Sequence, residues 1–296
     1  MADASVGETI DLGPLPQLIV SGILTGLLFA LISVGLTLIF GVMDVVNFAH
    51  GEFLMLAMYL TFGLALVGLN PILALPVVTV LMFILGVLVY RILIRRLLTG
   101  PSSAVVFGTF GLLVFLQGAA QYLFTSDYRS VAHPPFQGTL HLGSVNLGEA
   151  QLVAGMGALL LTALVFAFVE YTEPGRALRA LSEDRVAAQL MGIDVQRMNA
   201  IAFGLGIACV GAAGALLMLT YQAYPRIGTE FALTAFAIVA LGGFGSVQGA
   251  LVGAVLVGLV EVLGGFYISP ALKMIPVYLL YLLVVLVRPQ GLLGRR

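Results

Sequence analysis

The sequence predicts an all-α protein, a polytopic membrane helix bundle with about 8–10 transmembrane helices in a single domain. Of its 296 residues, 60% are hydrophobic and only 9% are charged, whereas a soluble domain carries about 25% charged residues. Apolar stretches of the ~20 residues that a helix needs to cross a bilayer core recur along most of the chain. A chain so poor in charge would not stay dissolved, so membrane insertion is predicted.

Nine stretches are long and apolar enough to be spans. The first is longer than one straight span requires, so the sequence allows either one long helix or a helix with a break in it. The seventh is short and ends at glycine. The nine stretches are 17–43, 50–69, 71–94, 103–124, 151–170, 200–221, 229–244, 248–267 and 275–288.

The distribution of arginine predicts the orientation, because cytoplasmic loops carry an excess of positive charge. Nine crossings then put the N-terminus in the periplasm and the C-terminus in the cytoplasm, with Arg226 and Lys273 as single exceptions on the outer side. The first sixteen residues contain acids but no Lys or Arg, so we expect a true first span rather than a signal peptide. The arginines assigned to the cytoplasm are Arg91, Arg95, Arg96, Arg176, Arg179, Arg185, Arg197, Arg288, Arg295 and Arg296.

The largest outer loop, 125–150, contains Pro134 and Pro135 followed by alternating polar residues. This pattern predicts a turn and a short hairpin or lid. Docking of an external partner and a simple connection between spans both remain open for this periplasmic loop.

Several chemistries are excluded by composition. A formal net charge of −1 gives no basic footprint for nucleic acid. One cysteine and three scattered histidines cannot build a disulfide framework or a metal cluster. Cys209 lies among small residues, so we interpret it as a packing residue.

Glycines recur at spacings that allow helices to approach closely in lipid. We expect these small faces to contact neighbouring helices of this chain rather than another subunit. One face is formed by Gly245, Gly249, Gly253 and Gly258, and a second by Gly204, Cys209, Gly211, Ala212, Gly214 and Ala215.

Four polar residues cluster within an otherwise apolar run: Asp44, Asn47, His50 and Glu52. Ionisable groups at membrane depth are costly and usually face a cavity or a partner. In one interpretation Asn47, His50 and Glu52 line a gate or substrate path, with Asn47 and His50 on one helical face. In the other, this is a cytoplasmic turn in which Asp44 caps the next helix and the amide and imidazole make structural hydrogen bonds.

Glu261 lies in an apolar stretch, and the nearest cation in that part of the sequence is Lys273, twelve residues on. A buried carboxyl must find a hydrogen-bond partner or stay protonated. A structural role and a pathway role are both open for it.

Residues 171–199 form a polar island between long apolar stretches. Pro174 suits the first position of a helix, Ser182 or Asp184 suits the cap of a second short helix over 185–191, and Gly192 suits a left-handed stop. Such short helices are unstable alone in water and need a surface to rest on.

The second short helix of the island is predicted to contact another protein. Its apolar contact surface is expected to comprise Ala187, Ala188, Leu190 and Met191, beside Arg185. The alternative is a helix lying on lipid headgroups. Glu183 and Asp184 make it a poor anchor for an anionic surface, which favours protein contact.

Three segments together resemble the LivH-type permeases of branched-chain amino acid ABC importers. They are GLTLIFGVMDVVNFAHGEFLMLAMY, SEDRVAAQLMGIDVQRMNAIAFGLG and AIVALGGFGSVQGALVGAVLVGLVE, and the resemblance extends over nearly the whole chain. The coupling-loop motif of ABC importer permeases is Glu-Ala-Ala, three residues, then Gly. Ala187, Ala188 and Gly192 fit this motif, whereas Val186 stands in place of the Glu.

The resemblance implies a permease subunit, 1–296, of an ATP-driven importer in the bacterial inner membrane. The implied partners are a second, LivM-type permease, two cytoplasmic ABC ATPases and a periplasmic solute-binding protein. ATP and magnesium would bind the ATPases, because this chain has no GxxxxGK[ST] phosphate loop. The chain would therefore be no enzyme, with no catalytic, cofactor or metal site of its own.

The expected cargo is a branched-chain or related amino acid. Alternatives are import of urea, short amides or other small polar solutes, or a secondary transporter or channel. The residues expected to border the substrate pathway are Asn47, His50, Glu52 and Glu261, and those expected to couple to the ATPases are Glu183, Asp184, Arg185, Ala187, Ala188 and Gly192.

Overall fold

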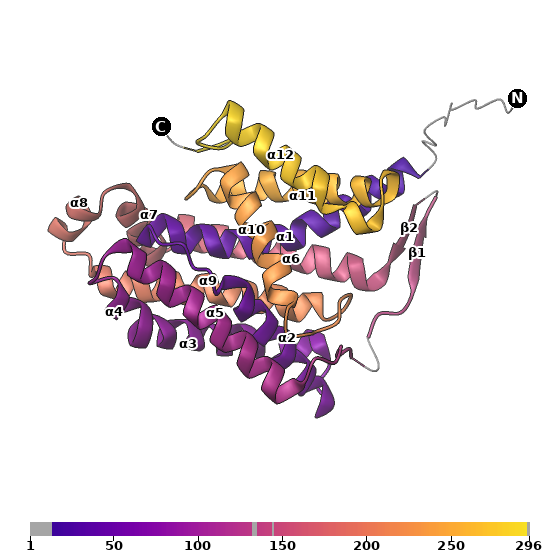
Figure 1. Cartoon of the computed structure of the whole chain (residues 1–296), viewed down its shortest axis with the longest axis horizontal. Coiled ribbons are helices and arrows are strands. Elements are labelled where there is room, and N and C mark those ends of the chain that lie inside the picture. Colours follow the sequence, from indigo (N-terminus) through magenta and orange to yellow (C-terminus); the bar gives the residue numbers. More distant parts are fainter. Residues whose placement is uncertain (1–13, 132–134, 144, 295–296) are drawn as a thin grey trace, which may run out of the picture.

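A computed structural model describes residues 14–131, 135–143 and 145–294. The protein is a bundle of helices with one short hairpin at one end (Figure 1). The elements are α1 (Leu15–Met43), α2 (His50–Leu66), α3 (Pro71–Val89), η1 (Tyr90–Ile94), α4 (Arg95–Leu97), α5 (Ser102–Phe124), β1 (Thr139–Leu142), β2 (Val145–Gly148), α6 (Glu149–Tyr171), α7 (Glu173–Glu183), α8 (Arg185–Leu190), α9 (Val195–Leu217), α10 (Ile227–Gly242), α11 (Val247–Tyr267), η2 (Pro270–Leu272) and α12 (Met274–Val287).

Each of the nine predicted apolar stretches corresponds to a helix or a run of consecutive helices, and the polytopic helical bundle is confirmed. Within the described residues, seven helical segments are long and apolar enough to cross a membrane, while α2 and α10 are shorter apolar helices. The first stretch is one continuous helix, so a break in it is not found. The N-terminal residues 1–13 and the arginines at 295 and 296 lie outside the described residues, and the orientation stays a prediction.

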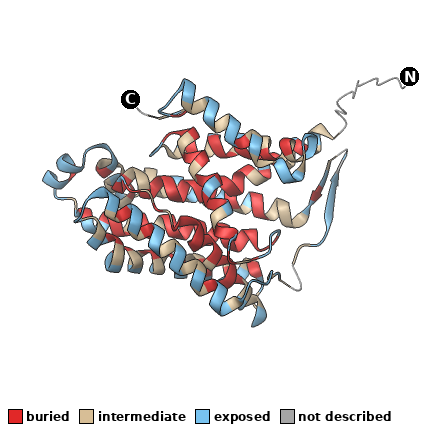
Figure 2. Ribbon diagram, viewed as in Figure 1, coloured by how far each residue is buried: buried red, intermediate tan, exposed pale blue. Residues whose placement is uncertain are grey.

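Helices α1 and α9 form the centre of the bundle (Figure 2). In their most apolar windows 83% and 89% of residues are buried, against 17% in α5 and 11% in the segment containing α12. Because lipid is as apolar as a leucine side chain, close packing of small residues replaces the hydrophobic effect here. A Cβ on Gly206 of α9 would meet the Gly35 carbonyl of α1 at 2.6 Å, so the two backbones touch.

The predicted small faces do pack within this chain. Gly211 of α9 lies against Met82 of α3, and Gly258 of α11 lies against the α1 backbone. Gly249 contacts the end of α10 in the same way. Gly245 differs from the expectation, because α11 begins only at Val247 and Gly245 belongs to the turn before it, where its φ of 80° requires a left-handed backbone.

The predicted hairpin is confirmed as β1 and β2, an antiparallel pair in which Thr139 faces Gly148. It is fixed to the start of α1, because Gln17 exchanges two hydrogen bonds of 2.6 Å with the Asn146 backbone. The hairpin and α8 lie at opposite ends of the bundle (Figure 1). This is the relation expected if loop 125–150 and the polar island face opposite sides of a membrane.

Candidate functional site

The connection between α1 and α2 turns back into the bundle. Asp44 ends α1 with a left-handed φ of 55°, and residues 44–49 are not helical. The Oδ1 of Asn47 accepts a hydrogen bond from the Ala49 backbone at 3.1 Å, which closes the turn that leads into α2. The prediction that Asp44 caps the second helix is therefore wrong. Asn47 precedes α2, so it does not share a helical face with His50 either.

His50 fixes the start of α2 beside the middle of α1. Its Nε2 lies 3.0 Å from the Ile32 carbonyl oxygen, and since a carbonyl only accepts, Nε2 carries the proton. Ile32 lies about three turns, or ~16 Å, before α1 ends at Met43. The connection is thus not a simple surface turn, because α2 begins deep in the bundle; the side of the membrane on which it lies stays a prediction.

Glu52 joins three helices at this depth. Its Oε1 accepts from Gln117 Nε2 on α5 at 3.1 Å and from Thr229 Oγ1 on α10 at 3.1 Å. Gln117 Nε2 also donates to Thr229 Oγ1 at 2.7 Å. Glu52 itself is fully buried, and its Oε2 has no hydrogen-bond partner among the described residues. We call Glu52, Gln117 and Thr229 the polar cluster.

The polar cluster lies where the first turns of α2 and α10 cross. A Cβ on Gly51 would overlap the Gly228 carbonyl oxygen, and a Cβ on Gly228 would meet the Gly51 carbonyl at 2.5 Å. Both positions therefore need glycine to let the two helix starts touch. Short or interrupted helices that meet inside a bundle are the usual pointer to the binding site of a transporter.

Sequence reasoning missed Gln117 and Thr229. Gln117 was detectable, because it is one of two amides, with Gln121, inside a mostly apolar span. Thr229 carried no such signal. Among the predicted pathway residues, Asn47 and His50 are also fully buried and make the structural hydrogen bonds of the second interpretation. Of the three residues Asn47, His50 and Glu52, only Glu52 is bonded to residues of other helices that are themselves partly exposed.

The entrance to α10 is fixed by a tyrosine. Tyr224, in the connection after α9, donates its hydroxyl to Glu230 Oε1 at 2.5 Å. Burial, and then this hydrogen bond to a carboxylate, raises the pKa of Tyr224 above the ordinary range of a phenol. The hydroxyl therefore stays a donor at any physiological pH.

Glu261 has a cation partner that the sequence reading did not assign to it. Lys273 Nζ lies 2.5 Å from Glu261 Oε1, because the turn containing η2 brings the start of α12 back onto α11. The Glu261 side chain is 5% exposed and that of Lys273 is 39% exposed. Among the described residues, Glu261 is thus bonded to Lys273 and not to the polar cluster. A pathway role for it stays a prediction.

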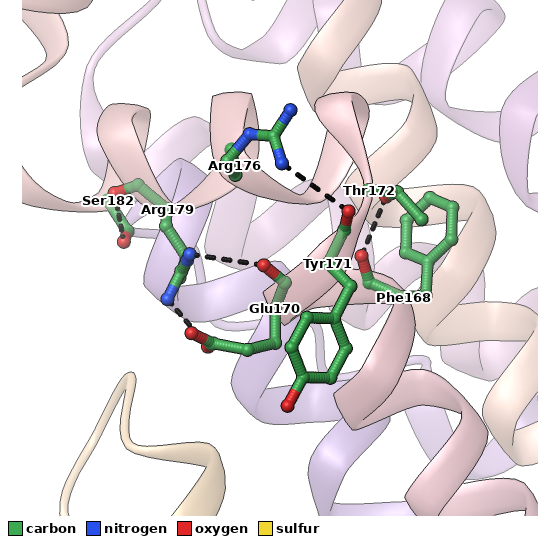
Figure 3. Close-up of polar contacts among 7 residues, drawn as sticks. All are labelled: Phe168, Glu170, Tyr171, Thr172, Arg176, Arg179 and Ser182. Atoms are coloured by element: carbon green, nitrogen blue, oxygen red, sulfur yellow. Dashed lines mark hydrogen bonds and ion pairs between the residues drawn. The ribbon is translucent and has the colours of Figure 1, made fainter.

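The polar island is two helices, as predicted, and α7 is fixed to the end of α6 (Figure 3). Thr172 caps α7 by accepting from Gly175 N at 3.1 Å and donates to the Phe168 carbonyl at 2.6 Å. Pro174 is therefore the second residue of α7 and not the first. Arg179 pairs with Glu170 at 2.6 Å.

Helix α8 projects from the end of the bundle (Figure 1). Asp184 caps it through hydrogen bonds from the Val186 and Ala187 amides. After α8 the chain reverses at Gly192, whose φ of 83° is the predicted left-handed stop, and Ile193 N donates to the Ala188 carbonyl at 3.1 Å.

The apolar surface of α8 differs from the predicted one. Ala188 is only 4% exposed and faces the chain's own core, because the turn at Gly192 folds back over it. The exposed apolar side chains are Val186 at 65%, Leu190 at 83% and Met191 at 83%. Ala187 is exposed as predicted. Val186 was missed as part of this surface.

Comparison with known proteins identifies the family. The model of the family described as "Branched-chain amino acid transport system / permease component" matches residues 18–286. The chain is 32% identical to the permease LivH of Escherichia coli K12, over 94% of this chain and 95% of LivH. It is 31% identical to BraD of Pseudomonas aeruginosa, with the same two coverages.

More distant similarities complete the comparison. The chain is 34% identical to LivM of Escherichia coli K12 over 40% of this chain and 28% of LivM. Among solved structures, the chain matches PsaBC from Streptococcus pneumoniae in complex with Fab, with a TM-score of 0.46 and 15% identity over 91% of each chain. That likeness supports no functional argument. The family match and the LivH similarity show that this chain belongs to the branched-chain amino acid transport permeases, a family of multi-pass membrane subunits of ABC transporters without catalytic activity of their own.

Proposed function

We propose that this chain is the LivH-type permease of an importer for branched-chain or related amino acids in the inner membrane. It would work beside a LivM-type permease, two cytoplasmic ATPases and a periplasmic solute-binding protein. The near full-length similarity to LivH and BraD supports this assignment, and the part of LivM that resembles this chain supports a related second permease.

The observation that best supports a substrate pathway through this chain is the polar cluster. It brings a carboxylate, an amide and a hydroxyl to one point where two short helices cross, ringed by apolar spans. Such groups suit the zwitterionic backbone of an amino acid, whose ammonium would bind the Glu52 carboxylate. Because Glu52 is fully buried here, this conformation is closed at the cluster, and Gln117 must move before substrate reaches the carboxylate.

Helix α5 is suited to make that movement. Along its length only Val105, Thr109 and Ala120 are buried, so little packing holds it to the bundle. Its outer end is fixed by the paired backbones of Arg129 and Ala223, with hydrogen bonds of 2.8 Å in each direction. A pivot about this end would carry Gln117 away from Glu52 and open the cluster.

The exposed tip of α8 supports coupling to an ATPase. Val186, Leu190 and Met191 are large apolar side chains that no described residue covers. A six-residue helix does not persist alone in water, and its cap at Asp184 and stop at Gly192 fix its direction. In a groove of the ATPase, α8 would pass the closing motion through α7 to α1 and α9, on which α7 packs.

Uptake by cells with and without the gene tests the substrate. Loss of labelled leucine or isoleucine uptake on deletion, restored by the wild-type gene but not by Glu52→Ala, is the expected result. Loss of labelled urea or acetamide uptake with normal leucine uptake would keep the permease and overturn the amino acid cargo. Restoration by Glu52→Ala would remove the carboxylate from the pathway.

A further inference from the structure

A second polar site lies away from the polar cluster, at the end of the bundle that carries α8. A cavity of about 560 Å³ is lined there by Arg91, Arg95, Arg96, Arg185 and Asn199, among others. Its volume lies within the ~300–1,000 Å³ range of small-molecule sites. No acidic residue lines it.

The π-helical turn η1 explains why three of these arginines face one cavity. A π turn is wider than an α turn, so residues four and five positions apart come to the same side. Arg91 lies in η1, and Arg95 and Arg96 follow in α4. Arg185, the first residue of α8, lines the same cavity.

The site has unmet hydrogen-bonding and charge requirements. None of its four guanidinium groups forms an ion pair with any residue that the structure describes. Asn199 of α9 is 1% exposed, and its Oδ1 is buried with no hydrogen-bond partner in the part of the chain that the structure describes. Four like charges around one space repel one another, so an anion that also offers a hydroxyl would satisfy both the arginines and the amide.

An apolar stripe leads from the membrane to this cavity. Exposed side chains follow one face of α3 and η1 at helical spacing, and they are Val77, Leu81, Ile84, Leu88 and Ile92. The stripe ends at Arg95 and Arg96. Only 22% of the most apolar window of this span is buried, so the stripe is open to acyl chains.

We propose that this cavity binds the headgroup of an anionic, hydroxyl-bearing phospholipid such as phosphatidylglycerol. Its phosphate lies among the guanidinium groups, its headgroup hydroxyl donates to Asn199 Oδ1, and its acyl chains follow the α3 stripe. The bound lipid bridges α3 and α8, because Arg185 belongs to α8 and the other arginines follow α3. It therefore steadies the base of α8 by neutralising the repulsion between Arg185 and the arginines that follow α3.

The test uses the whole transporter, delipidated in mild detergent and titrated with dioleoyl phosphatidylglycerol while bound lipid is counted by native mass spectrometry. Dioleoyl phosphatidylcholine is the comparison lipid. The wild type is expected to retain phosphatidylglycerol at least tenfold more tightly, since each arginine near an anionic lipid phosphate adds to the attraction. The double variant Arg95→Gln with Arg96→Gln should lose about tenfold in affinity for phosphatidylglycerol. The double variant Arg95→Lys with Arg96→Lys should retain most of that affinity.

The control variant is Arg176→Gln with Arg197→Gln. It removes two positive charges from the same predicted side of the membrane, but at positions outside the cavity, and it should leave lipid retention unchanged. Equal retention by the Arg95/Arg96 variant and the wild type would overturn the proposal. Displacement of the lipid by millimolar inorganic phosphate or glycerophosphoglycerol would show a soluble-phosphate site instead. Loss of the ATPase subunits from the Arg95/Arg96 variant, with lipid still bound, would assign the arginines to the partner.

Discussion

Gln117 on α5 donates to the buried carboxylate of Glu52 on α2 at 3.1 Å, and the same amide nitrogen donates to Thr229 on α10. One side chain thus joins α5, a loosely packed span, to the two short helices that begin inside the bundle. Since the rest of α5 buries few residues, this amide is the main polar link that keeps the cluster closed.

We predict that Gln117→Ala makes the polar cluster open more readily. The substitution removes both hydrogen bonds of the amide and leaves Glu52 with Thr229 alone. Interhelical hydrogen bonds in membranes contribute about 0.6–1.7 kcal/mol, so the folded protein should survive. ATP hydrolysis by the assembled transporter without substrate should rise about two- to tenfold, measured in proteoliposomes.

The matched control for the Gln117→Ala variant is Gln121→Ala. Gln121 lies one turn further along α5 and is exposed, and the side-chain contact it makes within the described ranges is a 3.5 Å one to Ser126. It should leave substrate-free hydrolysis unchanged. Equal rates in the wild type and both variants would show that Gln117 does not hold the cluster closed.

Gly51→Ala should prevent folding, whereas Gly63→Ala on the same helix should be tolerated. An added Cβ at Gly51 overlaps the Gly228 carbonyl, which is backbone and cannot turn aside, while nothing lies within 4 Å of one at Gly63. Overpacking costs ~1–3 kcal/mol even where side chains yield. The yield of monodisperse protein and its thermal midpoint in detergent measure the difference, and similar values for both variants would contradict the crossing.

The spans could be predicted from sequence because their signal is local, twenty apolar residues in a row. The polar cluster could not, because Gln117 is 65 and Thr229 is 177 residues from Glu52. The return of residues 44–49 depends on His50 finding a carbonyl in α1, which no local pattern encodes. Ala188 was misplaced for the same reason, since its burial follows from the turn at Gly192.

His50→Gln should lower stability without changing transport specificity. Gln keeps a donor for the Ile32 carbonyl but fills less of a fully buried site, so the loss should be about 1–3 kcal/mol. The thermal midpoint should fall while the KM for leucine and the pH profile of uptake stay as in the wild type. A changed KM or a shifted pH profile would instead place the imidazole in the substrate path.

Gly192→Val should uncouple ATP hydrolysis from uptake. The φ of 83° costs an ordinary L residue ~1–2 kcal/mol, and more for a β-branched one. No atom lies within 4 Å of a Cβ there, so the effect comes from redirecting α8 and not from a clash. Uptake should fall at least tenfold while the ATPase subunits still co-purify. Gly192→Asn, which tolerates left-handed backbone, should retain most uptake, and full uptake in the valine variant would contradict a coupling role.

The ion pair between Glu261 and Lys273 predicts an asymmetric response to losing either partner. Lys273→Met leaves a carboxylate that is 5% exposed without its cation, whereas Glu261→Gln leaves an ammonium that is 39% exposed and can reach solvent. Removing one member of a fully buried pair costs ~3–5 kcal/mol. Because the lysine end is solvated, we expect a loss of stability of about 2 kcal/mol for Lys273→Met and below ~1 kcal/mol for Glu261→Gln.

Thermal midpoints in detergent for both variants and for the double variant measure these losses. The double variant should be more stable than Lys273→Met, since it no longer buries an unpaired charge. Equal losses from the two single variants would mean that the pair is solvated at both ends and does not hold α12 against α11.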